Sequence, residues 1–145
     1  MSAKQKLLDA EDALWRELHR RLESIRGDLW LKPGVVEDWN PKDLLAHIAV
    51  WHASTTDRLE SLRMTGELPP HPDVDVFNLE QAERNRDLSL HEVQAMSGAS
   101  RHRFREEVDL LADEPGDLLT QVVNGNSTDH YREHIPHLDE FLRRA

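Results

Sequence analysis

The sequence predicts an all-α protein, a bundle of four main helices with a long connection between the second and the third. Apolar residues recur at intervals of three and four among charged residues, which is the spacing of amphipathic helices. Residues typical of helix caps stand before two of these stretches. No stretch alternates apolar and polar residues as a half-buried strand does. These observations favour a helical bundle.

The first helix is expected from about Lys4 to Arg26, where leucines stand at helical spacing among charges. Gly27 follows directly and is suited to end this helix in a left-handed cap. Residues 27–39 contain Pro33-Gly34 and no sustained period, so we expect a loop there.

The second helix is predicted to begin after Asn40, a strong N-cap residue, with Pro41 at its first position. Its apolar stripe includes His47, whereas His52 is rotated away from that stripe and is expected off the buried face. The helix is expected to end near Gly66.

Residues 66–76 are expected to form a proline-rich crossover, and a loop of this length between helices is often part of a site or its lid. A short helix is expected from about Phe77 to Arg86. The third long helix begins at Ser89-Leu90-His91-Glu92, which has the form of a capping box. A turn is expected at Glu114-Pro115-Gly116-Asp117.

The last helix lies between Leu118 and Arg143, and its start has two alternatives. It begins near Leu118 and tolerates Gly125, or it begins at a cap near Asn126 or Ser127. Pro136 removes one backbone hydrogen bond within it and is expected to kink or strain the helix.

Composition and charge narrow the class of protein. The 145 residues suit a single domain, residues 1–145. The absence of cysteine excludes disulfides and thiolate ligands, and a cytoplasmic location fits best. No apolar run approaches the roughly 20 residues that span a bilayer, so we expect no membrane partner. With a formal charge of −10, the chain lacks the excess of basic residues that gives most nucleic-acid binders their affinity, so we expect no nucleic-acid partner.

Three histidines are the candidate metal ligands. His130 and His134 stand one helical turn apart and can chelate one divalent ion. His47 lies on the apolar stripe of another helix, and facing helices of a bundle build metal sites in its interior. Three neutral imidazoles leave a coordination position for water or substrate, as in catalytic sites. His137 shares the stripe of the pair and is either a group that supports a ligand from behind or a surface residue.

Other chemistries lack their residues. No serine stands in a strand-to-helix elbow, and no glycine-rich phosphate loop occurs. A carboxylate-bridged dimetal site needs Glu-x-x-His, whereas Glu133 precedes His134 directly.

The chain resembles the DinB/YfiT-like superfamily of metal-dependent bundles, and within it the branch of ClbS/DfsB-type proteins. The order and spacing fit over nearly the full length. The matching residues are Trp39-x-x-Lys42-Asp43-Leu44-Leu45-Ala46-His47-Ile48-Ala49-x-Trp51, Asn126-x-x-x-His130-Tyr131-x-x-His134, Phe77-Asn78 and Leu88-Ser89-x-x-Glu92-Val93.

The resemblance implies a four-helix up-down-down-up bundle with His47, His130 and His134 as ligands of a divalent metal, with zinc or nickel favoured over iron or copper. Characterised relatives include transferases and isomerases that use a low-molecular-weight thiol, and a hydrolase that opens a cyclopropane in a genotoxin.

We therefore expect a metal-dependent enzyme, a hydrolase or thiol transferase that acts on a small electrophilic molecule in stress or detoxification. Two alternatives stay open: a metal-free binding or sequestration protein that uses the same cavity, and an interaction module whose bundle surface forms a homodimer. Candidate substrate-lining residues are Trp51, Thr55, Asn78 and Tyr131, with His71 arriving from the crossover.

Overall fold

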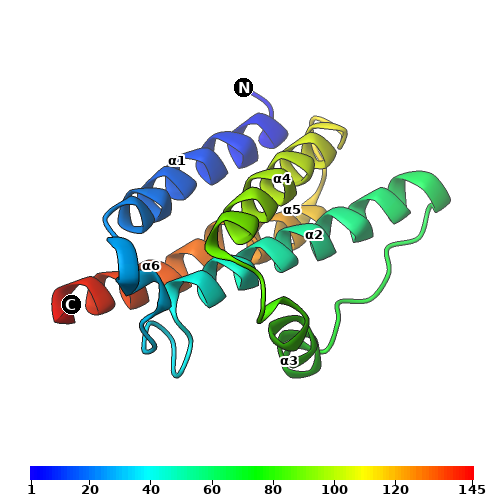
Figure 1. Cartoon of the computed structure of the whole chain (residues 1–145). Coiled ribbons are helices and arrows are strands. Elements are labelled where there is room, and N and C mark those ends of the chain that lie inside the picture. The colour runs from blue at the N-terminus through cyan, green and yellow to red at the C-terminus, as the bar shows by residue number, and fades with distance from the viewer.

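The computed structural model describes all residues 1–145 and confirms the all-α prediction. No strand is present; Val36 and Trp39 form one isolated antiparallel bridge. The elements are α1 (Ala3–Glu23), the 3-10 helix η1 (Gly27–Leu31), α2 (Pro41–Thr65), α3 (Val74–Asn85), α4 (Leu90–Asp109), α5 (Asp117–Gly125) and α6 (Thr128–Arg144) (Figure 1). None of these helices combines the length and the apolar content that crossing a bilayer requires.

The two predicted caps form as the sequence indicates. At the start of α2 the Asn40 side chain accepts from the Asp43 backbone N–H, and the Asp43 carboxylate accepts from the Asn40 N–H. Ser89 and Glu92 make the same reciprocal pair at the start of α4. Gly66 ends α2 with φ +82°, a left-handed conformation that glycine adopts at low cost.

Two helix boundaries and the role of Gly27 differ from the prediction. Helix α1 ends at Glu23, because Ser24 caps it in a right-handed conformation, and Gly27 begins η1 instead. Helix α3 begins at Val74, because the side chain of Asp73 accepts from a backbone N–H of the first turn.

The C-terminal region combines both predicted alternatives. Helix α5 runs from Asp117 to Gly125, Asn126 and Ser127 leave the helical conformation, and α6 starts anew at Thr128. Pro136 lies inside α6, which continues through it to Arg144.

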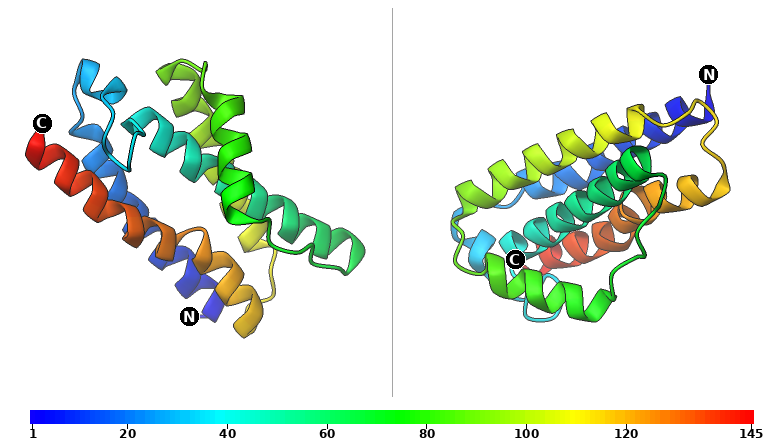
Figure 2. Two further views of the ribbon diagram at one scale, coloured as in Figure 1. Left: turned by 90° about the horizontal axis from the view of Figure 1, so that it is seen from below. Right: turned by 90° about the vertical axis from the view of Figure 1, so that its right-hand side faces the viewer.

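The long helices pack mainly as two pairs, α2 against α4 and α1 against α6, which Figure 2 shows side by side. Helix α3 stands outside them, contacts α2 and has no buried residue. The apolar core has two parts, one around Leu18, Ile48 and Phe141 and the other around Leu8 and Phe104.

Buried polar residues lie between these two parts along each long helix: Glu11 on α1, His52, Thr55 and Thr56 on α2, Ser97 on α4, and Ser127, Thr128 and His130 around the start of α6. They form a polar layer in the middle of the bundle, and a buried polar group is stable only when it finds a hydrogen-bond partner.

Candidate metal centre

His47, His130 and His134 meet across two helices. His47 projects from the first half of α2, and the other two project from neighbouring turns of α6. One ligand atom from each lies within 4.8 Å of the others, and the Nε2 atoms of His47 and His130 are 2.9 Å apart. His130 and His134 are buried and His47 is half-buried. The structure thus brings together all three residues that the sequence selected.

The three imidazoles are electron-pair donors at neutral pH. Burial, and to a smaller extent the neighbouring histidines, lower the pKa of His47, of His130 and of His134 to about 3. The rings are therefore neutral, which is the form that binds a metal.

The distance between the Nε2 atoms of His47 and His130 suits a divalent ion. Two nitrogens that bind one ion at about 2.0–2.1 Å stand about 2.9 Å apart at a right angle and about 3.3 Å apart at the tetrahedral angle. The 2.9 Å between His47 and His130 falls in this range, and without an ion it is a hydrogen bond between two neutral rings. Nε2 of His134 is buried and has no hydrogen-bond partner, which is costly unless a ligand occupies it.

His137 contacts His134. Its Nδ1 atom lies 3.1 Å from Nδ1 of His134, whose other ring nitrogen, Nε2, is buried without a hydrogen-bond partner. Such a contact fixes the orientation and the tautomer of a ligating imidazole.

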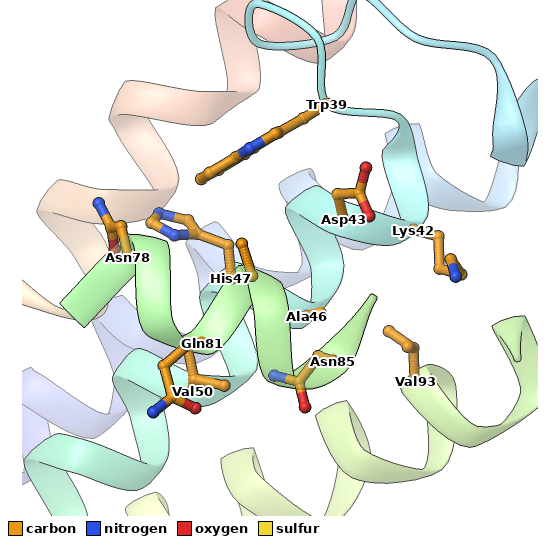
Figure 3. A pocket seen from close by; sticks show the side chains of 11 residues that line it. Trp39, Lys42, Asp43, Ala46, His47, Val50, Asn78, Gln81, Asn85 and Val93 are labelled. Atoms are coloured by element: carbon orange, nitrogen blue, oxygen red, sulfur yellow. The ribbon is translucent and has the colours of Figure 1, made fainter. Parts of the chain in front are cut away.

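A pocket opens beside His47 between α2 and α3. Its ≈ 390 Å³ of empty volume includes open solvent, and the centre of a water-sized sphere can occupy only ≈ 20 Å³ of it, so the pocket is narrow. Figure 3 shows Trp39 and Asn78 on either side of the His47 ring, and the Trp39 and His47 ring centres are 4.7 Å apart. The remaining lining residues are Lys42, Asp43, Ala46, Val50, Gln81, Ala82, Asn85 and Val93. His130 and His134 do not line this pocket, so His47 alone connects it to the triad.

Trp51 holds α3 over this region. Its indole N–H donates to Oδ1 of Asn78 at 2.8 Å. The centre of its ring lies 4.3 Å from that of Phe77 and 5.0 Å from that of His71, on which it stacks. Asn78 also lines the pocket, so one amide both fastens the helix and faces the cavity.

Thr55 and Tyr131 lie in the polar layer. The Thr55 hydroxyl accepts from Nδ2 of Asn126 at 2.7 Å. The Tyr131 hydroxyl donates to Glu11 at 2.8 Å and accepts from Nε2 of His52 at 2.6 Å. Both side chains are fully buried, and neither lines the pocket beside His47.

The prediction that His52 lies off the buried face is wrong. His52 is 0% exposed, because α2 is the central helix and is covered by its neighbours on several faces, so one apolar stripe does not describe its burial. Sequence reasoning also missed Glu11. The signal was present, since Glu11 lies on the same helical stripe as Leu7 and Leu18.

Comparison with known proteins rests on structure alone. No protein-family model matches the chain, and no curated protein matches it. The fold is similar to that of an uncharacterised protein from Escherichia coli UTI89, with a TM-score of 0.84 and 15% identity over 99% of this chain and 95% of the other. It is also similar to the colibactin self-resistance protein ClbS, solved in complex with dsDNA, with a TM-score of 0.74 and 14% identity over 98% and 96%.

These likenesses define the class of protein by its fold: an all-α protein with a ClbS-like fold. At such low identity they carry the fold and not the activity.

The expectation that the chain has no nucleic-acid partner is wrong, because ClbS, which has this fold, was solved with dsDNA. The expectation rested on the formal charge of −10. A total charge does not describe how charge is distributed over the surface, and binding depends on the local field.

Proposed function

We propose that this protein is a metal-dependent enzyme of the hydrolase or thiol-transferase class that acts on a small electrophilic molecule. The observation that carries the proposal is the cluster of His47, His130 and His134, three neutral donors within 4.8 Å of one another. We infer further that α1, α2, α4 and α6 form a single-domain up-down-down-up bundle of the DinB-like type.

Different residues would bind the metal and orient its ligands. His47, His130 and His134 would hold zinc or nickel, and His137 would orient His134. A divalent ion bound there supplies a Lewis acid that lowers the pKa of a bound water or thiol, or polarises the electrophile.

The substrate is expected in the pocket that His47 lines. Trp39 excludes water from one side of the imidazole, and the Asn78 amide offers a polar group to orient the substrate.

Metal content tests the proposal directly. Protein purified without an affinity tag and supplemented with zinc or nickel should retain a stoichiometric ion by elemental analysis. His47→Ala and His134→Ala should lose it, whereas His102→Ala should not, because the His102 side chain is 76% exposed on α4. Equal metal content in all four proteins would overturn the proposal.

A second candidate is a metal-free resistance protein that sequesters a small molecule, which the named role of ClbS as a self-resistance protein favours. The two candidates differ in one measurement. The measurement is turnover of the electrophile with and without EDTA, in the wild type and in His134→Ala. The metalloenzyme loses turnover under both conditions. Sequestration predicts no turnover, and an affinity for the bound electrophile that survives both.

DNA is a further candidate partner, because ClbS was solved with dsDNA. Fluorescence anisotropy of a labelled duplex at two salt concentrations tests it. Binding through phosphate contacts should weaken as salt rises, in proportion to the number of contacts.

A further inference from the structure

Arg58 is the one partly buried arginine of this chain without an ion-pair partner. Eleven arginines contact a carboxylate within 4.0 Å, and Arg26, Arg58 and Arg84 do not. Arg26 and Arg84 are exposed to solvent, whereas Arg58 is half-buried on α2. Removing a guanidinium from water without a counter-charge is unfavourable, so the position of Arg58 needs an explanation.

The Arg58 guanidinium makes one hydrogen bond within the protein. Its Nε–H donates to the backbone carbonyl of Pro69 in the crossover at 2.9 Å. Its two terminal nitrogens have no acceptor in the protein. Burial lowers the pKa of Arg58 from its ordinary value, but an arginine stays charged at neutral pH.

Arg58 borders two hollows: Asp57 and Arg84 are among the residues that line one of them, and the other is a cleft between α2, the crossover and α5. The empty volume of this cleft is ≈ 540 Å³, and its polar lining consists of Arg58, His71, Gln121 and Asn126, beside Leu118 and Val122. No carboxylate lines the cleft, although the chain has 28 acidic residues. An arginine without an ion-pair partner, among polar side chains that include no carboxylate, is an environment that attracts an anion.

The cleft lies on the same side of α2 as the triad. Arg58 follows His47 by eleven residues, about three turns, which returns it to the same face about 16 Å further along the helix. Two contacts extend from the cleft to residues of α2 that lie between Arg58 and His47: His71 stacks on Trp51, and Asn126 donates to Thr55.

We propose that the Arg58 cleft is an anion-binding subsite that takes a terminal carboxylate of a small molecule. Two free N–H groups on one edge of a planar guanidinium match the two oxygens of a carboxylate, and a single arginine balances its single charge. A ligand that reached both places would be elongated, with its anionic end about 16 Å from its reactive end. This last step rests on the proposed function, whereas anion binding at Arg58 does not.

NMR titration of the whole protein tests the subsite. Sodium acetate, added at constant ionic strength against sodium chloride, should produce saturable shifts in the backbone amides of residues 121–126. Arg58→Gln should weaken this response about tenfold or more, because it removes charge-assisted hydrogen bonds. Arg26→Gln is the matched control and should leave it unchanged.

A second variant keeps the test independent of the Arg58–Pro69 hydrogen bond. Gln121 is exposed, so Gln121→Glu should fold normally and abolish the acetate response by placing a carboxylate beside Arg58. His134→Ala should retain the response, and this separates the subsite from the metal proposal. Absent or diffuse shifts, unchanged shifts in Arg58→Gln, or tighter binding of phosphate than of acetate would overturn the carboxylate subsite.

Discussion

Replacement of Glu11 by alanine is the sharpest test of the polar layer. The Glu11 carboxylate is 1% exposed and accepts hydrogen bonds from Arg101 at 2.9 Å to each oxygen, from Arg105 and from the Tyr131 hydroxyl at 2.8 Å. Glu11→Ala leaves two guanidinium groups and one hydroxyl without this acceptor.

Removing one partner of a buried ion pair costs about 3–5 kcal/mol. In a chain of this length each kcal/mol lowers the melting temperature by roughly 2–4 °C, so we expect a decrease on the order of 10 °C. Urea unfolding and thermal unfolding followed by circular dichroism measure both quantities.

Asp12→Asn is the matched control, because Asp12 also contacts Arg101, at 3.1 Å, but its side chain is 36% exposed. We expect it to cost less than about 1 kcal/mol. If Glu11→Ala lowers the free energy of unfolding by no more than Asp12→Asn does, the hydrogen bonds of Glu11 in the polar layer do not stabilise the bundle.

Two further predictions concern pH and α3. Burial lowers the pKa of His52 to about 4, so its contribution to stability is complete above the ordinary histidine pKa of about 6.5 and is lost as the pH falls toward 4. Urea unfolding in EDTA should therefore show a smaller loss of stability between these two pH values in His52→Gln than in the wild type. An equal pH dependence in both proteins would contradict this prediction. Asn78→Ala removes the hydrogen bond from Trp51, so amide exchange should become faster in α3 and stay unchanged in α4; equal exchange in variant and wild type would show that Trp51 does not hold α3.

Features fixed by local chemistry were predictable from the sequence. The caps at Asn40 and Ser89 depend on residues three positions away, and both formed as expected. The start of the last helix was ambiguous because Gly125 and Ser127 are each compatible with two backbone paths, and the chain uses a break between two helices.

The candidate site likewise has features that were predictable from the sequence and features that were not. The one-turn spacing of His130 and His134 is visible in the sequence, but their approach to His47 depends on how α2 meets α6. The position of Glu11 on the stripe of Leu7 and Leu18 indicates its burial, but the hydrogen bonds of Glu11 and His52 could not be predicted, because each is made with a Tyr131 hydroxyl that reaches them from another helix. Which helix faces meet is a property of the whole bundle, and periodicity within one helix does not contain it.

The sequence separation of 83 between His47 and His130 has a consequence for folding. The pair on α6 is available as soon as that helix forms, whereas His47 joins it only after the chain has closed a long loop, a slow and entropically costly event. A ligand that needs all three imidazoles therefore distinguishes the native chain from partly folded ones. Such a ligand would act as a reversible crosslink between α2 and α6, adding stability only after the bundle is complete.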